Sequence, residues 1–468
     1  MTGRAHSSRL VRGLGFWGAS SLVVGTIIGT GVFLKTATMA QLGGSAAWVL
    51  AAWAAAGALS FAGALTYAEL GAMFPAAGGE YVYLRRGYGP LMAYLYAWTR
   101  FWIATPGSIA AYAVGSATFI GVVFPVSHDT LVLPFGELEA TKLVAIGFIA
   151  VFTAINCMNV RAGGNLQTAM TALKVLMICG LGFGALFAPR GDWTHLSAGG
   201  GFPGWSAFGA MVLAALWAYD GWNNLPMAAG EVRDPRRNVP RAIVGGAIVV
   251  FAIYALVNVG YFYALPFSEV ASSSSDKFPH APAVAANVAS QLLGDTTQAL
   301  LAAAMALSAL SAMNGSMLTG ARVPYAVARD NLAPKRLARL SEGAHVPITS
   351  VLVQGVLSSA FALSSSFDQI TDAVVFASWL FYALNAGSVV LLRIREPQRP
   401  RSFRVPGFPV VPIVFVVVAI LLLVNTVYTT FWPSALGLGM TSIGAVVYLA
   451  FLRGRARPLS DEDESLAG

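Results

Sequence analysis

Twelve apolar stretches, each long enough to cross a lipid bilayer as a helix, recur along the chain, and two are interrupted in their middle. With 56% hydrophobic and 11% charged residues, the 468-residue chain is not an ordinary soluble globule, and its short polar segments hold no separate catalytic domain. The sequence therefore predicts an all-α membrane protein with twelve spans, at about 16–40, 46–68, 91–123, 141–159, 166–188, 207–229, 242–265, 297–322, 348–364, 370–392, 410–428 and 433–452.

The interrupted stretches are the first and the sixth. The first carries Gly25-Thr26-Ile27-Ile28-Gly29-Thr30-Gly31, and the sixth carries Trp217-Ala218-Tyr219-Asp220-Gly221-Trp222-Asn223-Asn224. Unpaired backbone groups cost several kcal/mol in lipid, so a broken helix is tolerated there only where it lines a cavity. Two broken helices at matching places in two halves of a chain indicate the binding site of a secondary transporter.

The first break has the composition of an anion site. Gly25, Gly29 and Gly31 permit unusual dihedral angles and close approach, while Thr26 and Thr30 supply hydroxyls. The helix that restarts after the break presents N–H groups suited to a carboxylate. The alternative is that these glycines only let helices pack closely, as small residues do in membranes.

The second break combines aromatic rings, a carboxylate and two amides. Its unwound carbonyls are suited to a substrate ammonium group, and Asp220 either favours an amine-bearing substrate or caps the helix that restarts at Gly221. Trp217 and Trp222 either shape and gate the pocket or form an ordinary aromatic packing pair.

Lys174 lies about nine residues, or ~14 Å, into the fifth apolar stretch. An ammonium at that depth needs a partner, and the carbonyls freed by the first break are candidates. Lys174 then either takes the place of a coupling cation or couples transport to protons; otherwise it extends towards the membrane interface.

The net charge of +8 reflects topology. With the N-terminus in the cytoplasm, 23 of the 29 lysines and arginines fall in cytoplasmic segments, whereas the opposite side holds Lys35, Lys142, Arg190 and Lys277. This positive-inside asymmetry places both termini in the cytoplasm and removes the reason to expect a nucleic-acid partner.

No catalytic or cofactor motif stands out. The five histidines are scattered and lack metal-ligand spacing, and there is no Walker A loop or nucleophile elbow. Cys157 and Cys179 lie in apolar stretches and are expected to be packing residues. We therefore expect no enzyme activity, cofactor or metal site.

The chain divides into segments by hydropathy. A cytoplasmic tail, 1–15, precedes two five-helix units, 16–188 and 207–392, whose first helices are the broken ones. Two further helices with a preceding basic loop occupy 393–452, and 453–468 is a cytoplasmic tail ending in a solvated acidic segment. The largest loop, 266–296, is expected to be irregular, and the Glu231–Arg237 charge cluster to be a solvated loop.

Several motifs together resemble the amino acid–polyamine–organocation (APC) superfamily, most closely its L-type amino acid transporter branch. The resemblance covers about 12–455 and rests on the stretches Val24-Gly25-Thr26-Ile27-Ile28-Gly29-Thr30-Gly31-Val32-Phe33, Gly63-Ala64-Leu65-Thr66-Tyr67-Ala68-Glu69-Leu70-Gly71, Gly78-Gly79-Glu80-Tyr81-Val82-Tyr83-Leu84, Trp217 to Asn224, Pro235-Arg236-Arg237-Asn238-Val239-Pro240-Arg241 and Asn314-Gly315-Ser316-Met317.

The resemblance implies a 5+5 inverted repeat with alternating access. It places the substrate α-carboxylate against the backbone around Thr26, Ile27, Gly29, Thr30 and Gly31. It places the α-amino group against carbonyls of Ile27, Trp217, Ala218 and Asp220, with Trp217 as the gating aromatic. Lys174 matches the lysine that replaces a sodium site in related members.

Two departures matter. The loop at about 124–140 lacks the cysteine by which eukaryotic members join a heavy chain, so we expect no disulfide-linked partner. Asp220 stands where several neutral amino acid carriers have a small residue, whereas some relatives that handle cationic substrates carry Asp. The question whether the substrate is a neutral or a cationic amino acid therefore stays open.

The expected function is sodium-independent amino acid exchange in the plasma membrane, typically the bacterial inner membrane. The alternatives are a proton-coupled importer, a polyamine antiporter and an amino acid sensor; a sensor would be expected to carry an output domain.

Overall fold

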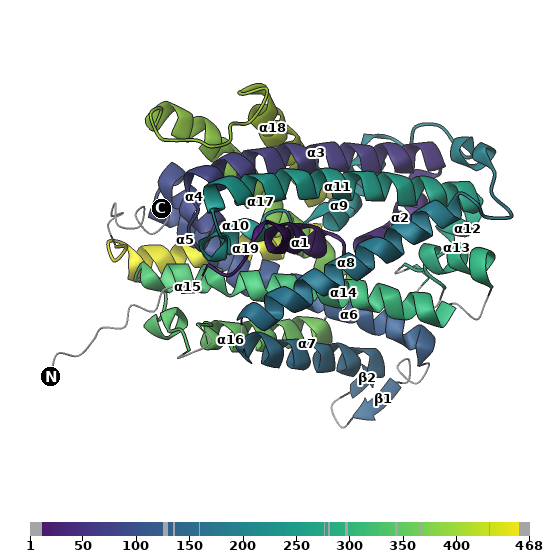
Figure 1. Cartoon of the computed structure of the whole chain (residues 1–468), viewed down its shortest axis with the longest axis horizontal. Coiled ribbons are helices and arrows are strands. Elements are labelled where there is room, and N and C mark those ends of the chain that lie inside the picture. The colour runs from purple at the N-terminus through teal and green to yellow at the C-terminus, as the bar shows by residue number, and fades with distance from the viewer. Residues whose placement is uncertain are drawn as a thin grey trace.

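In the computed structural model, the chain forms a bundle of helices whose axes run mostly along one direction (Figure 1). The structure describes residues 12–457 except 125–129, 134–135, 159, 276, 279–280, 295–297, 342–344, 365–366 and 430. Within that described part, nine helices are long and apolar enough to cross a membrane. The other three predicted stretches contain the shorter apolar helices Trp205–Tyr219, Ile348–Ser364 and Gly437–Leu452.

The first half of the chain forms one broken span, α1–α2, and four further long helical spans. In order, its elements are α1 (Phe16–Ile27), α2 (Gly31–Gly43), α3 (Ala46–Met73), α4 (Glu80–Tyr88), α5 (Pro90–Thr99), the π-helix η1 (Arg100–Ala104), α6 (Thr105–Val123), β1 (Thr130–Leu133), β2 (Gly136–Glu139), α7 (Ala140–Met158) and α8 (Val160–Ala185). The two strands pair antiparallel, with Thr130 opposite Glu139.

The second half repeats the pattern of a broken helix followed by long ones. Its elements are η3 (Trp193–Ser197), α9 (Trp205–Tyr219), α10 (Asn224–Met227), η4 (Ala229–Glu231), α11 (Pro235–Ala264), α12 (Phe267–Ala271), α13 (Val284–Leu293), α14 (Gln298–Gly320), α15 (Arg322–Arg329), η6 (Lys335–Ala338), α16 (Ile348–Ser364), α17 (Phe367–Arg395), α18 (Val410–Thr429), α19 (Phe431–Val447) and the π-helix η7 (Tyr448–Leu452).

Both predicted interruptions are present, since the first stretch divides into α1 and α2 and the sixth into α9 and α10. The prediction of an irregular loop at 266–296 is wrong, because this loop contains α12 and α13. The physical reason is that Val284, Ala285 and Val288 of α13 are fully buried, so the segment has an apolar face to pack. The acidic segment 459–468 lies outside the described residues.

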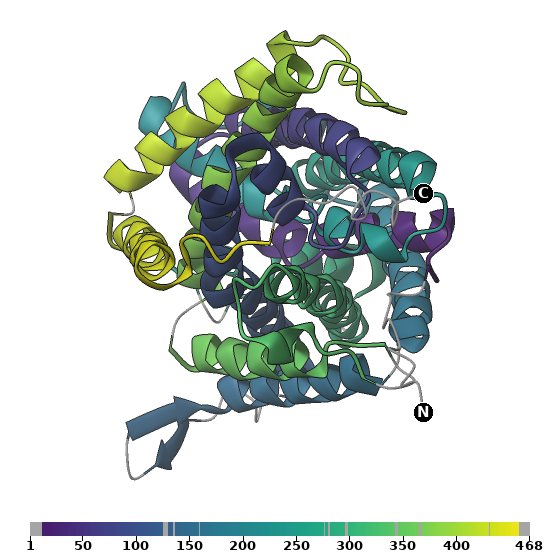
Figure 2. The ribbon, with the colours of Figure 1, turned by 90° about the vertical axis from the view of Figure 1, so that its left-hand side faces the viewer.

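The broken helices lie in the middle of the bundle. α1 packs against α8, α11 and α14, while α2 packs against α9 (Figure 1). In the most apolar stretch of α1–α2, 83% of the residues are buried, whereas the corresponding share in α18 is only 28%. Seen from the end, α18 and α19 (yellow-green and yellow) lie outside on one side, and α7 with α16 on another (Figure 2). The backbone of the two breaks is therefore surrounded by other helices of the protein and does not face lipid.

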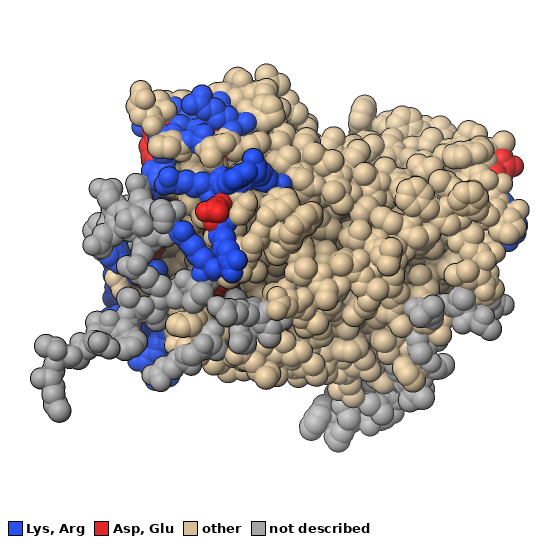
Figure 3. All heavy atoms as spheres, viewed as in Figure 1, with Lys and Arg blue, Asp and Glu red and all other residues tan. Residues whose placement is uncertain are grey.

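One end of the bundle carries most of the visible basic side chains (Figure 3). It is the end at which Figure 1 shows α4, α10 and α15, and we call it the basic end. The hairpin β1–β2, α12 and α13 lie at the opposite end. Between the two ends the surface in view is almost free of charge, as expected for a face that contacts lipid.

Ion pairs hold the segments of the basic end together. Glu231 of η4 accepts from Arg322 of α15 at 2.9 Å, and both side chains are at most 3% exposed. Glu69 of α3 pairs with Arg393 of α17 at 2.7 Å and with Arg401 at 3.3 Å. The Glu231–Arg237 cluster is therefore not wholly solvated as predicted, because its first carboxylate is buried and paired.

We predict that Glu231→Ala lowers the stability of the purified protein strongly, by about 3–5 kcal/mol, because it leaves the Arg322 guanidinium buried and unpaired. The matched control is Glu269→Ala, which removes the partner of Arg190 in an exposed pair and should change stability by less than about 1 kcal/mol. Thermal unfolding in detergent measures both, and equal shifts would contradict the prediction.

Candidate functional site

The first break is a short non-helical segment between two buried helix ends. α1 ends at Ile27, Ile28 has extended backbone (φ −73°, ψ 96°), and α2 begins at Gly31 after Thr30. Thr26, Ile28 and Thr30 are fully buried. The N–H groups of Gly31 and Val32, at the very start of α2, have no carbonyl of their own helix one turn earlier, whereas the Phe33 N–H already donates to the Thr30 carbonyl oxygen at 3.1 Å.

The second break is built in the same way. α9 ends at Tyr219, and Asp220 leaves the helix with extended backbone (ψ 144°). Gly221 follows with φ 129°, which L side chains rarely adopt, and α10 begins at Asn224. Gly221 is therefore required here by its backbone conformation.

The two breaks touch each other. The Thr26 hydroxyl donates to the Gly221 carbonyl oxygen at 3.1 Å. A Cβ added to Gly221 would lie 2.9 Å from the Ile27 nitrogen, and one added to Gly31 would lie 2.6 Å from the Ala218 Cα. The structure thus brings together Thr26, Ile27, Gly31 and Ala218, which the sequence placed in one site. The contact of Gly31 with Ala218 shows that this glycine also serves close packing.

Aromatic side chains enclose the breaks. The Trp217 indole nitrogen donates to the Thr30 hydroxyl at 3.4 Å, and the Trp217 ring lies 5.3 Å from that of Tyr112. Tyr112 also donates to the Thr26 carbonyl oxygen at 3.3 Å and lies against Gly29. Trp217 is 2% exposed, so this is a closed arrangement of the site.

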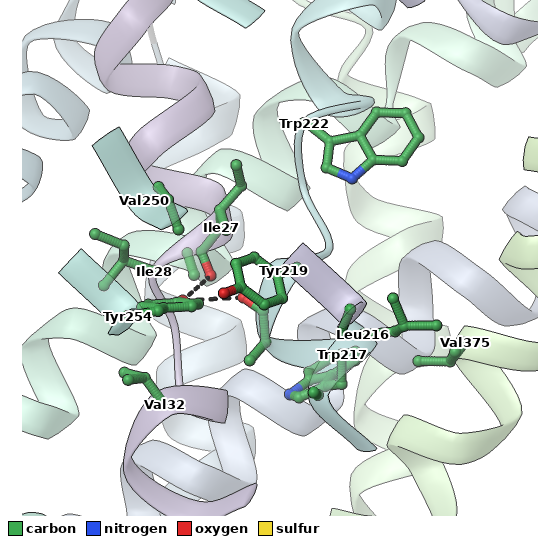
Figure 4. Close-up of a cluster of buried hydrophobic side chains, with 14 of the residues drawn as sticks. Ile27, Ile28, Val32, Leu216, Trp217, Tyr219, Trp222, Val250, Tyr254 and Val375 are labelled. Atoms are coloured by element: carbon green, nitrogen blue, oxygen red, sulfur yellow. Dashed lines mark hydrogen bonds between the residues drawn. The ribbon is translucent and has the colours of Figure 1, made fainter. Parts of the chain in front are cut away.

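Trp222 does not face Trp217. Its ring packs at 4.6 Å from Tyr67 of α3 and 5.0 Å from Tyr382 of α17, on the other side of the break (Figure 4). Of the two tryptophans, only Trp217 lies against the first break.

Tyr254 of α11 is a site residue that the sequence analysis missed. Its hydroxyl lies between the ends of α1 and α9, and its single O–H is shared between the carbonyl oxygens of Ile27 at 3.1 Å and Ala218 at 2.9 Å (Figure 4). These two carbonyls are among those assigned to a substrate ammonium. A tyrosine within an apolar helix is common, so the sequence alone carried no signal for this role.

Lys174 of α8 contacts the first break. Its ammonium donates to the carbonyl oxygens of Gly25 and Ile28, and to that of Ser308 of α14 at 3.2 Å. The side chain is 1% exposed. The expected contact with carbonyls of the break is therefore present, and extension towards the interface is excluded.

Asp220 has partners on both sides. Its Oδ1 accepts from the Tyr382 hydroxyl of α17 at 2.6 Å, and the carboxylate is also hydrogen-bonded to the Gly221 backbone N–H. The first contact is a tertiary bond. The alternative that Asp220 caps a helix restarting at Gly221 is wrong, because α10 begins only at Asn224 and its N-cap residue is Asn223. Asp220 is 8% exposed and already hydrogen-bonded in this closed arrangement.

In the part of the chain that the structure describes, no group of three or more His, Cys, Asp or Glu side chains is placed to hold a metal ion. Cys157 and Cys179 are free thiols, each partly buried.

Comparisons with known proteins show the family of the chain. A family model described as amino acid permease matches residues 14–452. The chain is 30% identical over 422 residues to b(0,+)-type amino acid transporter 1 of Mus musculus, covering 89% of this chain and 83% of that protein. It is 29% identical over 450 residues to the serine/threonine exchanger SteT of Bacillus subtilis (strain 168), covering 96% and 98%. It is 29% identical over 437 residues to the cystine/glutamate transporter of Homo sapiens, covering 92% and 83%.

These relatives are named as transporters, and the match spans both broken helices. The chain is therefore a multi-pass membrane protein of the amino acid permease family in the APC superfamily, similar to its L-type amino acid transporter branch.

Proposed function

We propose that this protein is a sodium-independent exchanger of L-amino acids across the plasma membrane, working by alternating access. The observation that carries the proposal is the contact between the two helix breaks, which gathers backbone donors and acceptors in one buried place. An amino acid carries one carboxylate and one ammonium, so it needs both kinds of partner. Exchange is also the activity in the name of SteT.

In this proposal, each end of the substrate meets one set of backbone groups. The α-carboxylate binds the backbone of the first break, around Thr26, Ile27, Gly29, Thr30 and Gly31, where the dipole at the start of α2 favours an anion. The α-ammonium binds carbonyl oxygens of Ile27, Trp217, Ala218 and Asp220 at the ends of α1 and α9. Trp217 then acts as the gate, because it packs against Thr30 and Tyr112.

Lys174 supports sodium independence. Carbonyl oxygens of an unwound segment are typical ligands of a coupling sodium ion in transporters with broken helices. Here the Lys174 ammonium donates hydrogen bonds to the Gly25 and Ile28 carbonyl oxygens, so a fixed positive charge of the protein takes the place of the sodium ion.

The proposed architecture has twelve spans. Residues 16–188 and 207–392 form two inverted five-helix repeats, and 393–452 adds helices 11 and 12. The basic end faces the cytoplasm by the positive-inside rule, as do the tails 1–15 and 453–468. The protein works without a disulfide-linked heavy chain, in keeping with the absence of a cysteine from 124–140. A bacterial inner membrane is the proposed location.

Two other transport modes have specific support. The buried ammonium of Lys174 suits a proton-coupled importer. The carboxylate of Asp220 suits a polyamine antiporter in which it holds a second amine.

Sodium-free proteoliposomes distinguish these modes. Uptake of labelled alanine, leucine, lysine and putrescine is measured with and without internal amino acid, and with and without a pH gradient. Exchange requires internal substrate. Uptake into empty vesicles that follows the pH gradient would establish the proton-coupled mode, and putrescine exchange would establish the antiporter.

Gly31→Leu is expected to abolish exchange while the protein still inserts in the membrane, because the new side chain collides with Ala218 and covers the carboxylate site. Gly180→Leu is the control, since a Cβ there meets no atom within 4 Å. Near-normal uptake by Gly31→Leu would refute the carboxylate assignment.

Lys174→Ala is expected to slow exchange by at least about tenfold, because it removes the ammonium that donates to three buried carbonyl oxygens. Lys142→Ala is the control, since this lysine of α7 is partly exposed and donates to the Leu363 carbonyl, away from the breaks. Wild-type kinetics of Lys174→Ala between pH 5 and 8, measured at roughly unit steps, would refute its role.

Tyr254→Phe is expected to raise the KM for exchange by about tenfold, because the O–H shared between the two carbonyls of the ammonium site no longer orients them. Tyr261→Phe on the same helix is the control, since its buried hydroxyl has no hydrogen-bond partner in the described structure. An equal effect of the two substitutions would show that loss of a hydroxyl, not of these contacts, matters.

A further inference from the structure

Two neighbouring residues of the second break are each held by a buried charged side chain that the proposed substrate chemistry does not use. The Asn223 amide donates to Glu80 Oε2 at 3.2 Å, and the Asn224 Oδ1 accepts from Arg100 at 2.8 Å. Glu80 is fully buried and Arg100 is 4% exposed. An anion and a cation from different elements thus fix adjacent residues just before and at the start of α10.

Glu80 gathers further donors from three other helices. Tyr67 of α3 donates to Oε1, and Tyr96 of α5 donates to Oε2 at 2.6 Å. The Asn385 amide of α17 approaches Oε1 at 3.5 Å. Each carboxylate oxygen therefore faces two donors, which suits an ionised carboxylate, because that group only accepts. One side chain thus joins α3, α4, α5, α17 and the second break.

The position of these segments matters for opening. α4 packs against α5 and α17 at the basic end (Figure 1). Arg100 opens the π-helix η1, and π-helical turns occur frequently at functional sites. A buried carboxylate contributes little net stability compared with an apolar side chain of the same size, so stability alone does not account for Glu80.

The other buried carboxylates of the basic end differ from Glu80. Glu69 and Glu231 are paired with arginines, and neither touches the breaks through the contacts that hold it. Glu80 is instead surrounded mostly by neutral hydroxyls and amides, which part from a carboxylate at lower cost than an ion pair does. This arrangement suits contacts that are broken and remade in every cycle.

We propose that Glu80 is a positioning residue for transport, which holds the second break against α3, α5 and α17 and thereby keeps the basic end closed. Opening of that end requires Asn223 and Asn385 to leave the carboxylate, and closing restores them. Arg100 acts with it by holding Asn224 from the α5–α6 side. The proposal rests on the proposed function, because it assumes that the basic end opens to release substrate.

The first test is exchange by Glu80→Gln in proteoliposomes. The glutamine amide nitrogen is a donor that meets other donors, so the cluster is weakened without loss of volume. We expect the maximal rate to change by at least about tenfold while KM changes by less than about threefold, since hydrogen bonds to a charged group are worth a factor of this order.

A second pair of variants keeps the test decisive if Glu80→Gln folds poorly. Tyr67→Phe and Tyr96→Phe each remove one hydroxyl from Glu80. Tyr81→Phe is the matched control, because Tyr81 lies on the same helix α4 and donates to Asp330 at 2.6 Å, away from the break. We expect both variants to alter the maximal rate, and the control to keep the wild-type rate.

A third measurement reads the opening itself. Ser388 of α17 is fully buried, one turn beyond Asn385, and a Cβ on Gly87 of α4 would lie 2.6 Å from its hydroxyl. Ser388→Cys is introduced after both native cysteines are replaced by serine, and a charged methanethiosulfonate reagent is added at the basic end. We expect Glu80→Gln to speed labelling by at least about tenfold, because the charged acceptor that holds Asn385 of α17 is replaced by a neutral amide and the contact is weakened.

The outcomes separate this inference from the proposed function. If the wild type exchanges amino acids and Glu80→Gln, Tyr67→Phe and Tyr96→Phe do so at the same rate, the inference is wrong. Unchanged labelling of Ser388→Cys in Glu80→Gln also overturns it. A wild type that exchanges no amino acid refutes the proposed function instead, and the labelling then still reports whether Glu80 holds α17.

Discussion

The cost of leaving a backbone N–H or C=O unpaired away from water governs this structure. Two helices stop in the middle of the bundle, and their terminal groups need partners that the helices themselves no longer provide. The partners come from neighbouring helices. Lys174 of α8 and Tyr254 of α11 donate hydrogen bonds to carbonyl oxygens at the broken ends, and the Thr26 hydroxyl donates to the Gly221 carbonyl oxygen. The same groups are the ones that a ligand with one carboxylate and one ammonium would use.

The buried charges are arranged around this requirement. One cation, Lys174, serves the first break, whereas Glu80 and Arg100 hold the asparagines of the second. The paired carboxylates Glu69 and Glu231 lie at the basic end, where their ion pairs with arginines join segments of that end to each other. Tyr254 of α11 contacts both breaks, but the buried charges fix the two breaks to different helices, so movement of these helices relative to one another changes the surroundings of the site.

Much of the candidate site could be predicted from the sequence because its signals are local. The breaks were found from Gly25 to Gly31 and from Trp217 to Asn224, and the contact of Lys174 with the first break was expected from its depth in an apolar helix. Tyr254, Tyr382 and the donors of Glu80 were not found. A tyrosine or asparagine in an apolar helix has many possible partners, and its place in the sequence does not select one. The helices of the loop at 266–296 were missed for a related reason, since their apolar face is evident only against the surface that it covers.

The sequence by itself determined that the chain forms apolar helices, where two of them break, and which end is basic, because hydropathy, helix-breaking residues and charge act over a few neighbouring positions. Only the tertiary structure decided which side chains satisfy the broken backbone. Those contacts join residues far apart in the chain, such as Tyr254 with Ile27, 227 positions away, and Asn385 with Glu80, 305 positions away. Hydrogen bonds are short and directional, so such a partner is fixed by the packing of the helices and not by the type of residue alone.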